Sequence, residues 1–156
     1  MAPDAVTSAA RGQWRTGALL VGIQFALIAA LAWPWGGYTL GPIGVSLFLL
    51  GSALGIGTLA VNRIGNFNIH PAPKASGHLI ETGPYRYVRH PMYLAVLLVA
   101  ASVVACDAAA SKWLLWALLL AVLRLKAALE ESMLRRAYPE YAAYCGRTGA
   151  FLPRFG

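Results

Sequence analysis

A short run of polar and aromatic residues, 83–93, holds most of the side chains that could do chemistry. It contains two arginines, one histidine, three tyrosines and two prolines, and long apolar segments lie on both sides of it. His90 directly precedes Pro91, a favourable residue for the first turn of a helix. Because a helix start binds anions through its free backbone N–H groups, we expect His90 and Tyr93 to hold an anionic group there, such as the carboxylate of a cofactor.

A second group of charged side chains lies near the end of the last long apolar segment. It includes Lys126, Glu130 and Glu131. Charged residues at the edge of a membrane span are costly to bury and are usually functional. A simpler interpretation is also open, because Lys126 and Glu130 stand one helical turn apart and would form an ion pair on a helix surface. No cluster of histidine, cysteine and aspartate has the spacing of a metal site, so we expect no bound metal.

The composition is that of a membrane protein. Of the 156 residues, 58% are hydrophobic and only 12% are charged, which is about half the charged share of a soluble protein. No charged residue occurs between Arg15 and Arg63, and that interval is long enough for two helical spans with a turn between them. The length corresponds to one domain, residues 1–156. The net charge of +7 suits basic segments that face anionic membrane lipids, so we expect no nucleic acid as a partner.

The apolar segments predict an all-α membrane protein with four transmembrane helices. The expected spans are residues 17–33, 41–62, 91–106 and 112–134. Residues 63–90 form the longest polar connection, and the prolines, glycines and asparagines in it predict an ordered, functional loop. Beyond the fourth span we expect a C-terminal helical extension, which Pro139 separates from the span.

Two glycines of the second expected span predict a close helix contact. Gly51 and Gly55 lie four residues apart, and small residues at this spacing allow another helix to approach closely. We expect the partner to be a helix of the same chain. Self-association through this face stays open as the alternative, so the oligomeric state is not predicted.

The basic residues predict an orientation in the membrane. With four spans, both termini and the 63–90 loop share one side, and of the thirteen lysines and arginines only Lys112 falls on the other side. By the positive-inside rule the shared side faces the cytoplasm, in the inner membrane if the source is bacterial. Cys106 and Cys145 then lie on opposite sides of the membrane and should not form a disulfide.

The second half of the sequence carries a series of motifs that belong together. They are Leu79-Ile80, the run Gly83-Pro84-Tyr85-Arg86-Tyr87-Val88-Arg89-His90-Pro91-x-Tyr93, the pair Glu130-Glu131, the spacing Tyr141-x-x-Tyr144 and a terminal Leu152-Pro153. From Asn62 to its end, the sequence resembles the integral-membrane methyltransferases related to isoprenylcysteine carboxyl methyltransferase and phosphatidylethanolamine methyltransferase. The first two apolar segments match that family only as hydrophobic helices.

The resemblance implies S-adenosylmethionine as the cofactor, in a pocket open to the cytosol, and S-adenosylhomocysteine as the product. Arg89 and Lys126 would lie near the substrate head group, and with Glu130 and Tyr85 they are the expected catalytic residues. Relatives that methylate a prenylcysteine carboxylate use a basic residue one turn before the glutamate pair, where this sequence has Lys126. The residues implied to bind the cofactor are Leu79, Ile80, Tyr85, His90, Pro91, Met92, Tyr93, Glu130 and Glu131.

The expected reaction is methyl transfer to a lipophilic acceptor that enters from the bilayer. The sulfonium methyl is already activated, so the protein must mainly align the nucleophile and exclude water. An isoprenylcysteine-like carboxylate needs no base, whereas an amine or a thiol must lose a proton, for which Glu130, Glu131 or Tyr85 is available. A phospholipid amine, a small thiol and a non-catalytic lipid-binding protein of the same fold remain as alternatives. The Gly-x-Gly-x-x-Gly fingerprint is absent, which argues against a soluble dinucleotide-type fold.

Overall fold

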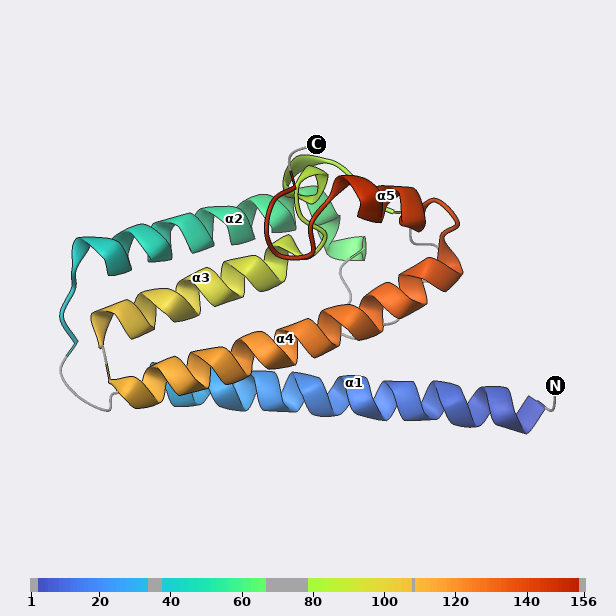
Figure 1. The fold of residues 1–156 in the computed structure, drawn as a ribbon, viewed down its shortest axis with the longest axis horizontal. Helices are drawn as coiled ribbons and strands as arrows, with labels where there is room; N and C mark the ends of the chain where they lie inside the picture. The colour runs from blue at the N-terminus through green and yellow to red at the C-terminus, as the bar shows by residue number, and fades with distance from the viewer. Residues whose placement is uncertain (1–2, 34–37, 67–78, 108, 155–156) are drawn as a thin grey trace.

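The computed structural model describes residues 3–33, 38–66, 79–107 and 109–154, and its regular elements are helices (Figure 1). Within these residues there is no strand, only a single bridge between Val88 and Gly149. The prediction of an all-α fold is therefore confirmed for the described part of the chain. The elements are α1 (Pro3–Ala32), α2 (Pro42–Asn66), the 3₁₀ helix η1 (Gly83–Arg86), α3 (Pro91–Cys106), α4 (Ala110–Ala137) and α5 (Tyr141–Arg147).

The four long helices run alternately in opposite directions (Figure 1). As a result the start of α1, the end of α2, the start of α3 and the end of α4 lie toward one end of the bundle, together with α5. The connection between α2 and α3 is shorter than the predicted loop 63–90, because α2 continues to Asn66 and η1 is helical. Residues 67–78 of that predicted loop lie outside the described residues.

Two stretches are long and apolar enough to cross a membrane. They are Trp14–Ala32 in α1 and Pro42–Asn62 in α2. In the most apolar 18 residues of each stretch, only 22% and 17% are buried. Large apolar side chains of both point outward, for example Phe25, which is 59% exposed, and Ile56, which is 69% exposed. Water would penalise such surfaces, whereas lipid tails would not. With the family assignment below, this indicates association with a membrane.

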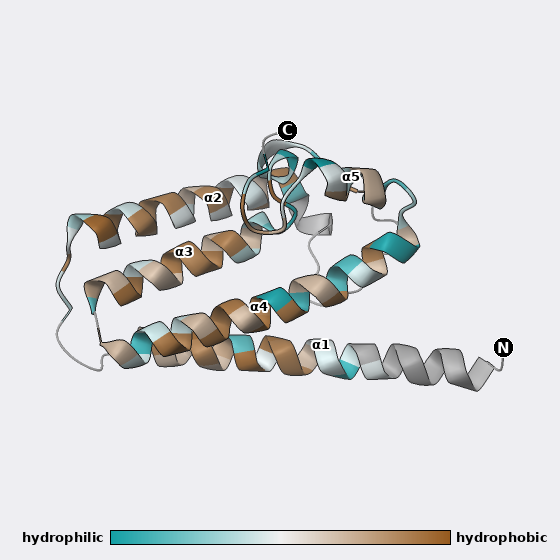
Figure 2. Cartoon of the chain, viewed as in Figure 1, coloured by the Kyte–Doolittle hydropathy of each residue, from teal (hydrophilic) through white to brown (hydrophobic). Residues whose placement is uncertain are grey.

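The other two long helices differ from these. α3 is apolar but has only 16 residues, which reach about 24 Å at 1.5 Å each against a hydrocarbon core of about 30 Å. α4 is long, but apart from Lys112 in its first turn its charged residues lie in its C-terminal half, where Figure 2 shows several hydrophilic bands. The four-span arrangement therefore stays a prediction, with two spans supported by length and composition.

The glycines of α2 pack against α3. A Cβ atom at Gly51 would lie 2.9 Å from Val99 Cγ2 and 3.0 Å from the backbone oxygen of Ala95, and a Cβ at Gly44 would lie 2.5 Å from Cys106 Sγ. Only glycine allows this approach. The prediction of a partner within the same chain is confirmed, and the small-residue face is used inside the molecule.

This packing predicts a strong effect of a single methyl group. Gly51→Ala should lower stability by about 1–3 kcal/mol, because the new Cβ would have to push α3 away. Gly22→Ala is the matched control, since a Cβ at Gly22 meets nothing within 4 Å and alanine is the better helix former. Thermal unfolding of the two variants in detergent measures the difference. Equal melting temperatures would show that the α2–α3 contact is looser than described.

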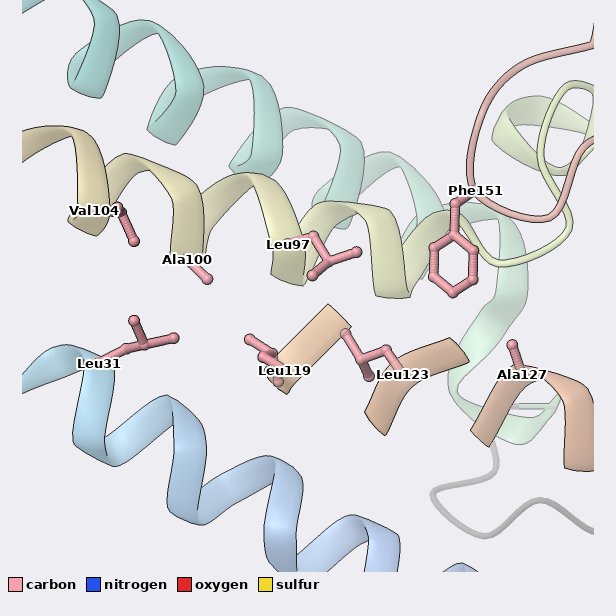
Figure 3. Packing of buried hydrophobic residues seen from close by; sticks show 8 residues of the cluster. All are labelled: Leu31, Leu97, Ala100, Val104, Leu119, Leu123, Ala127 and Phe151. Atoms are coloured by element: carbon pink, nitrogen blue, oxygen red, sulfur yellow. The ribbon is translucent and has the colours of Figure 1, made fainter. Parts of the chain in front are cut away.

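A hydrophobic core lies between α1, α3 and α4, and Figure 3 shows its buried residues. In Figure 3, Leu31 of α1 lies opposite Val104 and Ala100 of α3. Farther along the bundle, Leu97 of α3 and the α4 residues Leu119, Leu123 and Ala127 continue the core toward Phe151 of the C-terminal segment. A polar cluster lies at the other end of the bundle. There the fully buried Lys112 pairs with Asp107 at 2.8 Å and donates to the Tyr38 hydroxyl at 3.2 Å. The core positions the two helices that carry the candidate site.

Candidate active site

The candidate site lies where the entry to α3 meets the C-terminal half of α4. η1 leads into it, and Gly83 takes a positive φ of 59° that suits glycine. A Cβ at Gly83 would lie 2.6 Å from Val61 Cγ2, so this turn lies directly against the end of α2. Pro91 then begins α3, and His90 occupies the residue before the helix. Gly83 and Pro91 together determine the position of His90 between the turn and α3.

His90 lies between the two glutamates of α4. Its Nε2 is 3.1 Å from Glu131 Oε1 and its Nδ1 is 3.5 Å from Glu130 Oε2. The Tyr93 hydroxyl donates to the other oxygen of Glu130, and the rings of His90 and Tyr93 stack with centroids 5.4 Å apart. With Arg89, these residues are called the carboxylate cluster below: Arg89, His90, Tyr93, Glu130 and Glu131.

The pKa of His90 is set by opposing effects. Burial lowers it, but the hydrogen bonds and negative charges of Glu130 and Glu131 outweigh burial and leave the pKa above its ordinary value. The imidazolium form is thereby favoured between the two carboxylates. The cluster can accept cationic groups through its carboxylates, whereas both ring nitrogens of His90 already face those carboxylates.

Arg89 joins the cluster to the end of the chain. Its Nε donates to Glu131 Oε1 at 2.8 Å, and its Nη1 donates to the carbonyl oxygens of Thr148 and, at 3.4 Å, Cys145. The side chain is only 12% exposed. This guanidinium therefore has its donors directed at protein groups on α4 and at the end of α5.

The segment after α5 folds back onto the site. The N–H groups of Arg89 and His90 donate to the carbonyls of Gly149 and Ala150, at 2.8 and 3.1 Å. Phe151, 4% exposed, stacks on His90 with centroids 5.9 Å apart. These contacts engage two backbone donors that the sequence suggested for an anion. The N–H groups that a helix start leaves without an intrahelical partner are then those after Pro91, at Met92 and Tyr93.

Lys126 lies one turn before the cluster and is 5% exposed. It does not pair with Glu130 at ion-pair distance, which was the simpler interpretation of their spacing. Its Nζ donates to Gln24 Oε1 of α1 at 3.0 Å and lies 5.0 Å from the centre of the Tyr93 ring. A buried ammonium group thus stands beside the cluster with a neutral hydrogen-bond acceptor.

Tyr85 of η1 is half-buried, and its pKa is raised to about 12 by burial and by the negative charge of Glu130. It is therefore a neutral hydrogen-bond donor near pH 7 and not a base. Its carbonyl accepts from the Tyr144 hydroxyl at 2.6 Å. Leu79 and Ile80 are half-buried in the connection before η1. Their expected contact with a cofactor stays a prediction.

Two contributors to this site were missed by the sequence analysis. No local pattern in the sequence shows that Phe151 returns to His90. Gln24 had a usable signal, because it is the only amide in the otherwise apolar expected span 17–33. Cys106 and Cys145 are both free, as predicted.

Comparison with known proteins gives the family. The family model for phospholipid methyltransferases matches residues 40–141, from just before α2 to the first residue of α5. All five residues of the carboxylate cluster lie in this range. The chain belongs to the phospholipid methyltransferase family. The resemblance to integral-membrane methyltransferases that the motifs suggested is therefore confirmed.

One relative of this chain is named for a different role. It is the cobalt-zinc-cadmium resistance protein CzcN of Cupriavidus metallidurans, 32% identical over 125 residues. The match covers 77% of this chain and 54% of the relative, so the chain spans about half the length of that protein. Among the described residues no group of three histidine, cysteine, aspartate or glutamate side chains is placed to hold a metal ion.

Proposed function

We propose that this chain is a membrane methyltransferase that uses S-adenosylmethionine and acts on a lipophilic acceptor. The observation that carries the proposal is the carboxylate cluster, which joins α3 and α4 next to a buried lysine. A buried charge without an ion-pair partner is costly away from water. An ion-pair network that only stabilised the fold would not need Lys126 beside it, so a functional role explains this residue better. Membership of a methyltransferase family supports the same reading.

The residues present fit the cofactor. When bound, S-adenosylmethionine supplies a methyl group on a cationic sulfonium. Glu130 provides negative charge for its ammonium group, and the Tyr93 hydroxyl that donates to Glu130 holds this carboxylate in place. The N–H groups of Met92 and Tyr93 would hold the carboxylate, and the positive charge of the nearby His90 would favour it there. Leu79, Ile80, Tyr85, Pro91 and Glu131 complete the proposed cofactor-binding set.

The buried ammonium of Lys126 favours an acceptor with an anionic nucleophile. Gln24 fixes one N–H of Lys126, and the charge remains to attract a carboxylate or a thiolate near the transferred methyl. A protonated phospholipid amine would be repelled there. Since Tyr85 stays protonated near pH 7, Glu130 is the candidate to accept a proton if the acceptor is an amine or a thiol. Arg89 donates from Nε and Nη1 to protein groups, which supports a positioning role.

In the proposed arrangement, four helices span the membrane and the carboxylate cluster faces the cytoplasm. The positive-inside rule supports it, since the helices that alternate in Figure 1 bring both termini and the α2–α3 connection to one end. Membrane lipids and the acceptor are the proposed partners, without nucleic acid, and a homo-oligomer is not required for the site.

The deciding experiment is calorimetric titration of the detergent-purified chain with S-adenosylhomocysteine. Binding at micromolar to submillimolar ligand is expected, and no binding at millimolar ligand would overturn the enzyme in favour of a non-catalytic lipid-binding protein. Radiolabelled methyl transfer then compares a prenylcysteine carboxylate, phosphatidylethanolamine and an alkyl thiol. Methylation of phosphatidylethanolamine alone would contradict the anionic acceptor.

A further inference from the structure

A hollow of about 520 Å³, lined by several charged residues, opens on the surface beside η1 and the C-terminal segment. Its lining includes Arg86 and Tyr87 from the turn that leads to α3, Arg147 from α5 and Arg154. None of the five residues of the carboxylate cluster lines it. The hollow is thus a feature that the proposed methyl-transfer site does not use.

The hollow has an excess of positive charge. Three guanidinium groups line it, against the single carboxylate of Glu81, which leaves two positive charges in excess. Glu81 pairs with Arg147 at 2.9 Å. Within the described ranges, Arg86 and Arg154 have no carboxylate at ion-pair distance and are exposed. The guanidinium groups of Arg86 and Arg154 are therefore available to donate hydrogen bonds to a ligand.

The hollow lies at the level where the apolar stretch of α2 ends. Gly83 approaches Val61, and Pro84 Cγ lies 3.9 Å from the position of a Cβ at Gly57, so the turn that carries Arg86 runs along the last turns of that stretch. Leu152, two residues before the Arg154 that lines the hollow, is 74% exposed. In a bilayer this level corresponds to the lipid head groups, with apolar side chains toward the acyl chains.

We propose that this hollow binds the phosphate group of an anionic phospholipid in the leaflet that its end of the bundle faces. Guanidinium groups bind phosphate oxygens in pairs, with a geometry that an ammonium group lacks. The uncompensated charge favours a lipid with a net negative head group over a zwitterionic one. The exposed Leu152 favours a lipid over a free phosphate ion, because it offers contact to an acyl chain. Lipid binding here does not depend on whether the chain transfers methyl groups.

The test compares two double variants of the full chain in neutral detergent by native mass spectrometry. Arg86→Gln/Arg154→Gln should bind dioleoylphosphatidylglycerol at least tenfold more weakly than the parent, while dioleoylphosphatidylcholine binding stays unchanged. Arg15→Gln/Arg136→Gln removes two equally exposed positive charges elsewhere and should change phosphatidylglycerol affinity less than twofold. Arg154→Gln alone gives the same direction with a smaller change, should the double variant purify poorly.

Three results of the lipid-binding measurements would overturn the proposal. Equal losses in both double variants would mean that phosphatidylglycerol responds only to net charge. Parental affinity in Arg86→Gln/Arg154→Gln would mean that the hollow does not bind it, and inorganic phosphate that competes at equal affinity would make the ligand a free anion. Titration of the same samples with S-adenosylhomocysteine separates the two sites. Unchanged cofactor affinity in Arg86→Gln/Arg154→Gln is expected, and its loss would assign the hollow to the cofactor.

Discussion

Glu130→Gln should weaken S-adenosylhomocysteine binding by about 10- to 100-fold and lower methyl transfer at least as much. Glu130 accepts a hydrogen bond from the Tyr93 hydroxyl and faces His90 Nδ1 at 3.5 Å. Glutamine keeps the size of this side chain but removes the negative charge that the ammonium group of the ligand would face. A charge-assisted hydrogen bond contributes about 1.5–3 kcal/mol, which corresponds to this range of affinity. Calorimetry measures the change.

Two further variants show whether the effect is specific to Glu130. Glu140→Gln changes an exposed glutamate before α5 and should leave ligand affinity as in the parent. Glu131→Gln should lower the free energy of unfolding, because Glu131 accepts a hydrogen bond from Arg89 at 2.8 Å. Its effect on ligand affinity should be smaller than that of Glu130→Gln. If Glu130→Gln bound S-adenosylhomocysteine like the parent, Glu130 would not be a cofactor residue, even if the activity were correct.

The contact between His90 and Glu130 could be predicted from the sequence because local signals determine where the helices begin and how they connect. Pro91 fixes the start of α3, and a short turn after Cys106 makes α4 return alongside α3. Antiparallel neighbours bring the start of one helix to the end of the next. The polar run before Pro91 therefore had to lie near the glutamate pair, and the structure places their side chains within 3.5 Å.

The remaining part of the site depends on contacts that no local pattern encodes. The bridge between Val88 and Gly149 joins residues far apart in the sequence through backbone groups, which every residue carries. That bridge and the neighbouring backbone hydrogen bonds of Arg89 and His90 bring Phe151 to His90. The pairing of Lys126 with Glu130 was a reasonable expectation from helix spacing, but it competes with Gln24 on a different helix, and tertiary contact decided between them.

Arg89→Lys should detach the C-terminal segment and lower stability by about 2 kcal/mol, or roughly 4–8 °C in melting temperature. Arg89 bonds to Glu131 and to the carbonyls of Thr148 and Cys145. Lysine keeps the charge, but a single ammonium group cannot reach an acceptor on α4 and two carbonyls beyond it with the same geometry. Thermal unfolding in detergent and the rate of tryptic cleavage after Arg147 measure the change.

Arg86→Lys is the matched control, since it makes the same substitution at an exposed residue three positions earlier. It should melt with the parent and be cleaved after Arg147 at the parental rate. Because the segment carries Phe151 onto His90, its release in Arg89→Lys should also weaken S-adenosylhomocysteine binding. A variant that loses stability but keeps parental ligand affinity would show that the C-terminal segment supports the fold without forming part of the cofactor site.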